Sequence, residues 1–305
     1  MNNNSNNKKT ELRPLFQRLI PLTTLCAGLF NSMAATAGVI TSDPGDYVPF
    51  PEGTSLALLY YKHAERDHVY RNGRKQDVQG FGLDSDIAAL RAVHYLQLGQ
   101  FLIAPNAILP FGRLKQNGSP DDSSTGVADP LLGSALWLVN DPQRQRYLSL
   151  GAWVAPPLGS YDAKDGPLNL GENRWKGILH TSYSQPLVGN LVGEVTAEWD
   201  FFGKNDDFAG ATRRQSPIFE LQTHLRYDFA PGNFAALSYY DTRGGENELD
   251  GVNLDDELNT RRYKISLARM LTPDVQVLGD IGKDIDVENG PKEKFRVGFR
   301  LMKIF

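Results

Sequence analysis

Ionisable side chains recur at every second position in several segments of this chain. Successive side chains of a β-strand point to opposite faces, so alternate charged residues would share one face. Opposed acidic and basic rows across a pore create a field that orients polar solutes, and rings of charge set ion selectivity. The alternative is a salt-bridged plug that fills a narrow barrel. The candidate lumen-lining residues are Glu194, Glu198, Asp200, Glu220, His224, Arg226, Lys264, Arg296 and Arg300.

Two aromatic residues share a face with small residues in segment 146–158. Tyr147 and Trp153 fall on the same side of this segment as Ser149 and Gly151. If that side faces inward, the two rings could stack with an aromatic solute. The alternative is that they pack within the protein or belong to a girdle at the membrane interface.

A histidine and a serine two residues apart suggest an enzymatic alternative. His180 and Ser182 would lie on one face of a strand, and their spacing resembles the His-x-Ser pair of outer-membrane phospholipase A. That family continues with Asn-Gly, whereas Tyr183 and Ser184 follow here. A serine nucleophile also needs a third group that orients its base, and the sequence identifies none. We therefore assign no catalytic residue and keep a barrel-borne phospholipase or esterase as an alternative.

The segment 241–258 is rich in carboxylates. It could bridge divalent cations to anionic lipopolysaccharide, although a solvated acidic loop is the simpler interpretation. Asp250 and Asp255 bracket several oxygen ligands, but their spacing is not that of an EF-hand. No set of histidines has the spacing of metal ligands. No phosphate-binding or dinucleotide fingerprint occurs either, so we expect neither a metal site nor a cofactor.

Strands must position these side chains, and the connections between candidate strands alternate between short and long. Short turns are expected near residues 98–99, 140–142, 188–190, 231–233 and 272–274. Long polar loops are expected over 64–83, 113–127, 159–173, 203–215, 242–259 and 284–292. This pattern, with about twelve strands, is typical of bacterial outer-membrane β-barrels, which have short periplasmic turns and long extracellular loops.

The residue pattern within the strands supports a barrel. In 218–229, apolar and aromatic residues alternate with polar ones, with Thr223 and Ile218 as the exceptions. Segments of about 10–14 residues are longer than most sandwich strands, and aromatic residues gather at their ends as in an interfacial girdle. The segment 295–305 alternates and ends on Phe305, which resembles the assembly signal of outer-membrane proteins. Prolines 105, 110, 156 and 157 favour strand ends, bulges or bends, because proline lacks a ladder donor.

The N-terminus has the features of a secretory signal peptide. A basic region up to Arg18 precedes the apolar stretch 19–30, and Ala35-Thr36-Ala37 is a cleavage motif. We therefore expect a signal peptide over 1–37 and a single barrel domain over 38–305. The only cysteine, Cys26, would leave with the signal, so the mature chain would contain no disulfide. The net charge of −4, without a basic cluster, argues against nucleic acid as a partner.

Several short strings, taken in their order along the chain, carry a family resemblance. They are DYVPFPEGT (46–54), YRNGR (70–74), GVADP (126–130) with Gly133, APPLGSYD (155–162) and NRW (173–175). Together they resemble the meta-pathway phenol-degradation family of outer-membrane transporters, over roughly residues 46–305. The family's usual Pro-Thr-Gly string reads Pro-Pro-Leu-Gly here. The resemblance implies an outer-membrane barrel that moves aromatic or other hydrophobic compounds.

These observations predict an all-β protein, a transmembrane antiparallel barrel in the outer membrane of a Gram-negative bacterium. We expect passive uptake of small hydrophobic or aromatic compounds through its lumen, and no enzymatic activity. A non-transporting envelope protein is the second alternative beside the hydrolase. The expected partners are outer-membrane lipid and lipopolysaccharide, a small-molecule solute, and the barrel-assembly machinery through the strand that ends at Phe305.

Overall fold

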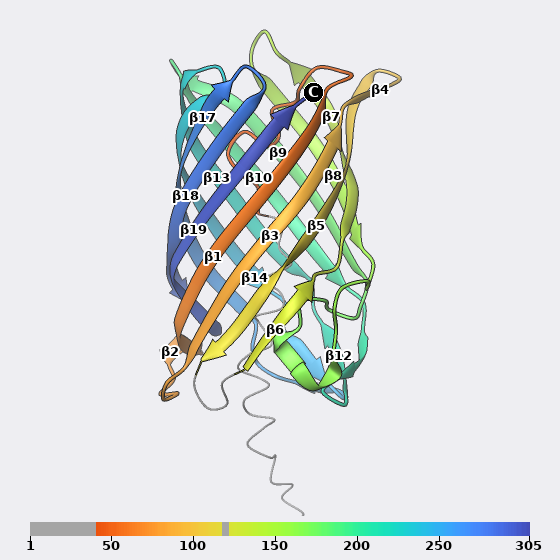
Figure 1. Cartoon of the computed structure of the whole chain (residues 1–305), viewed down its shortest axis with the longest axis vertical. Coiled ribbons are helices and arrows are strands. Elements are labelled where there is room, and N and C mark those ends of the chain that lie inside the picture. The colour runs from red at the N-terminus through yellow and green to blue at the C-terminus, as the bar shows by residue number, and fades with distance from the viewer. Residues whose placement is uncertain (1–40, 118–121) are drawn as a thin grey trace, which may run out of the picture.

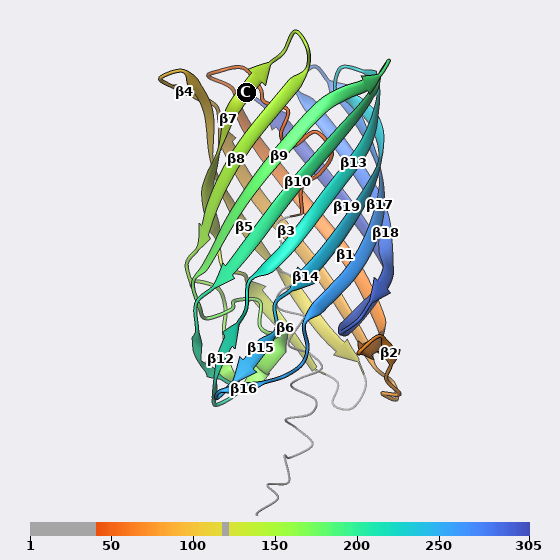
Figure 2. The same cartoon turned by 180° about the vertical axis from the view of Figure 1, so that it is seen from behind.

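The computed structural model describes residues 41–117 and 122–305, so the predicted signal peptide lies outside the described residues. Within that part of the chain, twelve antiparallel strands form a closed barrel, which confirms the predicted fold (Figures 1 and 2). The barrel strands are β1 (Ser55–Arg71), β3 (Gly82–His94), β5 (Phe101–Asn117), β7 (Leu131–Asp141), β8 (Arg146–Ala155), β9 (Lys176–Val188), β10 (Leu191–Phe202), β13 (Ile218–Ala230), β14 (Asn233–Gly244), β17 (Leu258–Thr272), β18 (Val275–Val287) and β19 (Gly290–Ile304).

The first and last strands close the barrel. β1 pairs with β19 from Leu56 opposite Ile304 to Tyr70 opposite Gly290. Two backbone hydrogen bonds between Ser55 and Phe305, N···O 3.2 and 2.9 Å, finish this seam. The closed ladder leaves no sheet edge along the seam, as a protein wall in lipid requires.

One end of the barrel carries only short turns, as the sequence predicted. Turns of a few residues join β7 to β8, β9 to β10, β13 to β14, and β17 to β18. The other end carries the longer connections, which contain the short helix η1 (Ala163–Leu168) and a small sheet (Figure 2). The short elements at this end are β2 (Arg74–Lys75), β6 (Asp122–Val127), β11 (Asn205–Phe208), β12 (Ala211–Gln215), β15 (Asn247–Leu249) and β16 (Val252–Asn253). β4 (Leu96–Leu98) lies at the short-turn end, where it pairs with the start of β5 (Figure 1). By the usual asymmetry of these barrels, the short-turn end is periplasmic.

The strands extend further at the extracellular end than the sequence suggested. β1 continues to Arg71, and only residues 288 and 289 separate β18 from β19, so the predicted long loop over 284–292 is wrong. Charged residues form strands here because they pair inside the barrel. Arg66 pairs with Glu293, and Arg262 Nε lies 2.9 Å from Asp284 Oδ1. Polar composition was therefore a misleading sign of a loop.

Each proline in β5 lies beside a break in a neighbouring ladder. Pro105 lies in the gap between Asn106, where pairing with β3 ends, and Ile103, where pairing with β4 begins, and Pro110 lies where pairing with β7 gives way to pairing with β6. The missing N–H therefore costs little, because it falls where the neighbouring ladder is already interrupted. Pro156 and Pro157 directly follow the last residue of β8.

The outer wall of the barrel is apolar. Leu90, Leu267 and Ile281 point outward and are each at least half exposed. Trp199 and Phe219 pack ring against ring on this surface, with centroids 5.0 Å apart. Such a belt matches the hydrocarbon region of a bilayer, with aromatic rings toward its edges. No helix among the described residues is long and apolar enough to cross a membrane.

Candidate functional site: the barrel lumen

The residues before β1 fold back into the lumen from the periplasmic end. We call residues 41–50 the plug segment. Ser42 and Asp43 are almost fully buried, with exposed fractions of 1% and 3%, although they belong to no strand. They are buried because the barrel wall surrounds them, and their polar groups are matched by inward-facing side chains.

Ion pairs hold the plug segment to β17 and β19. Lys264 Nζ lies 2.7 Å from Asp43 Oδ1, and Arg300 Nη1 lies 3.3 Å from the second oxygen of Asp43. Arg300 Nη1 also contacts Asp46 Oδ1 at 2.8 Å. Burial by itself raises the pKa of Asp43, but Lys264 and Arg300 outweigh it and hold that pKa well below its usual range.

Hydrogen bonds hold the same segment to the next strands of the wall, β14, β13 and β10. The backbone N–H of Ser42 donates to Gln222 Oε1 at 2.7 Å, and the hydroxyl of Tyr240 donates to the carbonyl of Ser42 at 3.2 Å. The N–H of Gly45 donates to Glu194 Oε2 at 2.8 Å. Gly45 has a φ of 85°, and a Cβ there would lie 2.6 Å from a guanidinium nitrogen of Arg226, so this position requires glycine.

Tyr47 reaches the third side of the lumen. Its hydroxyl lies 3.1 Å from His180 Nδ1, and the two rings meet edge to face with centroids 4.5 Å apart. Trp153 packs on the other side of His180, with centroids 4.4 Å apart. Trp137 Nε1 donates to the carbonyl of Tyr47 at 3.0 Å. The plug segment is thus attached to strands all around the barrel.

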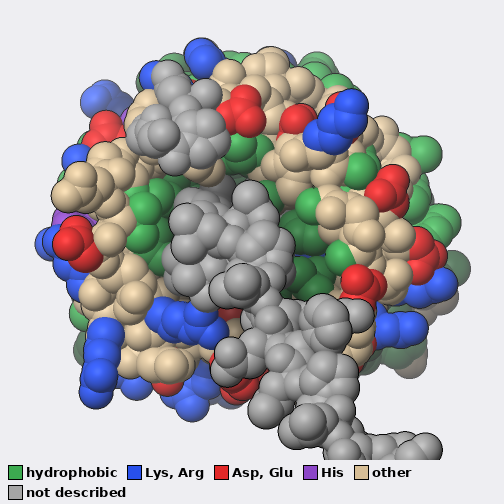
Figure 3. All heavy atoms as spheres, turned by 90° about the horizontal axis from the view of Figure 1, so that it is seen from below, with side chains coloured by type: hydrophobic (Ala, Val, Ile, Leu, Met, Phe, Trp, Pro, Cys, Tyr) green, Lys and Arg blue, Asp and Glu red, His purple; other side chains and the backbone are tan. Residues whose placement is uncertain are grey.

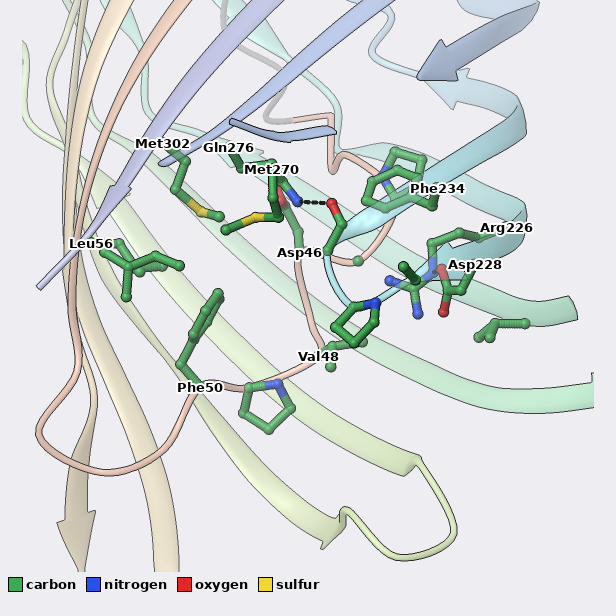
Figure 4. A pocket seen from close by; sticks show the side chains of 18 of the residues that line it. Asp46, Val48, Phe50, Leu56, Arg226, Asp228, Phe234, Met270, Gln276 and Met302 are labelled. Atoms are coloured by element: carbon green, nitrogen blue, oxygen red, sulfur yellow. Dashed lines mark hydrogen bonds and ion pairs between the residues drawn. The ribbon is translucent and has the colours of Figure 1, made fainter. Parts of the chain in front are cut away.

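A large cavity lies between the plug segment and the periplasmic turns. We call it the vestibule; its volume is about 1180 Å³. Figure 4 shows side chains of both kinds around it, with apolar groups from the plug segment and the wall beside a few charged ones. Its lining includes Asp46, Val48, Phe50, Leu56, Tyr147, Val192, Arg226, Asp228, Phe234, Met270, Gln276 and Met302. A concave, mainly apolar site with a few polar groups is the usual form of a small-molecule site.

Buried charges line the extracellular half of the lumen. Glu293 lies between Arg66, Arg262 and Arg296, and Lys176 Nζ contacts Asp200 Oδ2 at 2.8 Å. The cavity beside Arg66 and Glu293 measures only about 20 Å³, enough for about one water. Figure 3 shows basic and acidic side chains around the rim at this end.

A second charged cluster lies at the same end, outside the barrel strands. Arg174 Nε donates to Glu172 Oε2 at 2.8 Å, and Arg213 Nε donates to Asn247 Oδ1 at 2.8 Å. Burial, with the nearby charge of Arg174, lowers the pKa of Arg213 to about 9. The extracellular connections are therefore held by charge pairing together with an apolar cluster that includes Phe81, Leu168 and Leu170.

The structure places the nine predicted lumen-lining residues on the inner side of the wall. Four contact the plug segment: Glu194, His224, Lys264 and Arg300. The other five contact neighbours on the wall: Glu198 with His180, Asp200 with Lys176, Glu220 with Thr242, Arg226 with Glu194, and Arg296 with Glu293. Their role as solute contacts stays a prediction.

The two aromatic residues predicted to contact a solute, Tyr147 and Trp153, lie in different places. Tyr147 lines the vestibule, whereas Trp153 lies against His180, where its Nε1 donates to Asn106 Oδ1 at 3.1 Å. Sequence reasoning missed the plug segment altogether. Its only signal was an acidic and aromatic string, DYVPF, between the signal peptide and the first strand.

The histidine and serine of the hydrolase alternative are not joined. Ser182 Oγ accepts a hydrogen bond from Thr196 Oγ1 at 2.9 Å, and His180 is engaged by Tyr47. Within residues 41–117 and 122–305, no hydrogen bond links His180 to Ser182. The same residues contain no group of histidine, cysteine and carboxylate side chains arranged to hold a metal ion.

A closed twelve-stranded barrel with an apolar outer belt and a polar interior defines an outer-membrane β-barrel protein. The chain belongs to the family described as "Putative MetA-pathway of phenol degradation", whose model matches residues 66–301. This membership confirms the resemblance drawn from the sequence.

One solved structure is similar over nearly the whole described chain. The COG4313 outer membrane channel from Pseudomonas putida F1 is 34% identical and covers 87% of this chain and 100% of its own, with a TM-score of 0.83. The β domain of the Bordetella autotransporter BrkA shares the barrel fold at 10% identity, covering 84% of this chain and 100% of its own, with a TM-score of 0.50. No curated protein matches the chain. The fold and these similarities establish an outer-membrane channel.

Proposed function

We propose that this channel admits small aromatic or other hydrophobic compounds to the periplasm by passive diffusion. The vestibule is the observation that supports this cargo best. Pores for ions and sugars are lined mainly by polar groups, whereas this cavity combines Phe50, Phe234, Met270 and other apolar residues with a smaller number of charged groups. Solute would move down its gradient without energy coupling, and the plug segment would have to shift for it to pass.

The charged groups of the vestibule support solutes that carry one polar substituent. The guanidinium of Arg226 lies over the Phe234 ring at 5.4 Å, and its Nε lies 3.2 Å from Asp228 Oδ1. A planar solute could stack beside this pair and hydrogen-bond to either member. Tyr147, on the same wall, would add the aromatic contact predicted from the sequence.

Two expectations about processing and partners belong to the same proposal. We propose cleavage between Ala37 and Gly38, which would leave one barrel domain over 38–305. Assembly through the strand ending at Phe305, and contact with lipopolysaccharide at the extracellular rim, follow from the outer-membrane location. The proposed transport depends on neither the cleavage site nor these partners.

Uptake by proteoliposomes tests the cargo. Val192 and Val195 lie on the same strand, but Val192 lines the vestibule and Val195 faces lipid. Val192→Trp should reduce uptake of a fluorescent aromatic solute severalfold by filling the cavity, and Val195→Trp should leave uptake unchanged. Absence of uptake by the folded wild-type barrel, or equal uptake by both variants, would contradict the proposal.

A further inference from the structure

The plug segment places a phenol ring of its own inside the lumen. The ring belongs to Tyr47, which lies on no strand and points at the wall formed by β8 and β9. There it packs against an apolar cluster that includes Ile108, Leu131 and Ile178. The side chain of Tyr47 thus occupies this part of the wall as a phenol ring that is covalently part of the chain.

The wall around Tyr47 has the features of a site for a hydroxylated ring. We call Ile108, Leu131, Trp153, Ile178 and His180 the phenol niche. Apolar residues and the Trp153–His180 pair surround the ring, and His180 Nδ1 meets the hydroxyl at 3.1 Å. His180 is 4% exposed, so the Tyr47 hydroxyl takes the place of water at this nitrogen.

Glycine on β8 allows this arrangement. Gly151 is directly opposite His180, and a Cβ at that position would come within 2.4 Å of both the Trp153 ring and His180 Nε2. The missing side chain lets the indole lie across Gly151 and against the imidazole. The niche therefore depends on packing over four neighbouring strands, β5, β7, β8 and β9.

We propose that the phenol niche binds phenolic solutes, and that Tyr47 occupies it when no solute is present. A phenol that enters the niche replaces the ring and hydroxyl contacts of Tyr47, so the plug segment loses one of its attachments. This rests on the proposed function, and it deepens that function by naming a substrate class and the step that admits it. Solute and plug compete for the same histidine.

Contact with a hydroxyl group should make the phenol niche selective for phenols over aromatic compounds that lack one. An aromatic solute without a hydroxyl group, such as toluene, can fill the apolar part of the niche but cannot replace the 3.1 Å contact at His180 Nδ1, whose other polar neighbour, Glu198 Oε2, lies 3.8 Å away. Phenol should therefore displace Tyr47 more effectively than toluene by about tenfold, the equivalent of one buried hydrogen bond.

Cysteine labelling measures this displacement. The predicted mature chain has no cysteine, and Ser42 is 1% exposed beside Gln222, so Ser42→Cys gives a single buried thiol on the plug segment. A charged maleimide reacts with it only when the segment leaves its place. In the folded barrel, phenol should raise the labelling rate about tenfold above toluene at equal concentration.

Substitutions of Tyr47 provide the decisive comparison, each made in the Ser42→Cys background. Tyr47→Ala should label rapidly without phenol and gain nothing from it, because the competitor is gone. Tyr47→Phe keeps the ring, so it should label at an intermediate rate. Tyr161→Ala, which removes a phenol ring from an extracellular loop, should behave like the parent. If Tyr47→Ala fails to give a heat-modifiable barrel, Tyr47→Phe decides.

Two results would contradict the proposal that the niche binds phenols in competition with Tyr47. One is equal acceleration of labelling by phenol and toluene, and the other is an undiminished phenol response after Tyr47 is changed. Uptake measured on the same preparation separates this inference from the proposed function. Phenol-selective labelling without uptake would refute the transport proposal alone, whereas uptake with unselective labelling would refute the niche alone.

Discussion

The two halves of the lumen have the same wall but different contents. In the periplasmic half the twelve strands enclose a cavity of about 1180 Å³, whereas beside Glu293 in the extracellular half the cavity is about 20 Å³. β1 shows the cause: Leu56 and Leu58 face the vestibule, and Arg66 faces the charged half. Strand number sets the bore of a barrel. The side chains at inward positions then decide whether that bore is open.

The contrast also separates two ways of filling space. In the extracellular half, the charged residues that point inward belong to the wall strands and pair with each other, so they cannot leave the lumen. The middle of the lumen is occupied by the plug segment. This segment precedes β1 in the chain and is held in place by non-covalent contacts with side chains of the wall. Only the second kind of filling can be removed without unfolding the barrel.

The largest effect is expected where the filling is permanent. Glu293→Gln removes the carboxylate shared by Arg66, Arg262 and Arg296 and leaves three buried cations poorly paired. We expect a loss of about 3–5 kcal/mol in the free energy of unfolding. Urea unfolding in lipid vesicles measures it. Glu248→Gln breaks an exposed pair with Arg214 and should cost less than about 1 kcal/mol. Equal losses would show that the extracellular charges do not support the barrel.

The next effect concerns the removable filling. Asp43→Asn takes the negative charge from between Lys264 and Arg300, so the plug segment loses its strongest attachment. We expect the fraction of open channels in planar bilayers to rise about tenfold or more, with the barrel still folded. Asp274→Asn breaks the pair with Lys303 near the same end of the barrel and should not open the channel. A silent Asp43→Asn channel would mean that the segment is not what closes the pore.

A smaller effect is expected from backbone geometry in the plug segment. Gly45→Ala adds a Cβ that would lie 2.6 Å from the Arg226 guanidinium, at a φ of 85°. Gly53→Ala has nearly the same φ, 84°, but nothing within 4 Å of the added carbon. Both substitutions cost about 1 kcal/mol of backbone strain, so only the clash distinguishes them. Gly45→Ala should open the channel severalfold more than Gly53→Ala does, as measured by conductance.

The smallest expected effect is that of mild acid on Asp43. Lys264 and Arg300 lower the pKa of Asp43 in the folded protein, so its contribution to stability is present above the unfolded pKa and is lost only as pH falls through the lowered value. The fraction of open channels in planar bilayers should therefore be the same at pH 7 and near pH 5, since both lie above the usual carboxylate range. A marked rise at pH 5 would show that Asp43 is not held by these cations.

Strand periodicity explains what could be predicted from the sequence. Alternation alone assigned Glu194, His224 and Lys264 to the inner face, because side chains at every second position of a strand point to the same face. The partners of these residues lie in the plug segment. That segment forms no strand, so its sequence has no alternation of apolar and polar residues from which its position could be predicted. Alternation also failed to mark the end of β1, where Arg66 looked like a loop residue but faces the charged half of the lumen.

The position of the plug segment next to β1 has a consequence for the order of assembly. Asp43 and Arg300 are separated by 257 residues, and the segment enters through the open periplasmic end rather than through the wall. The chain need not enclose the segment while β1 and β19 meet, because it can thread in afterwards. Contacts that close so long a chain form late in folding. We infer that each newly inserted barrel is leaky for a time, and that docking of its own N-terminal residues completes its maturation.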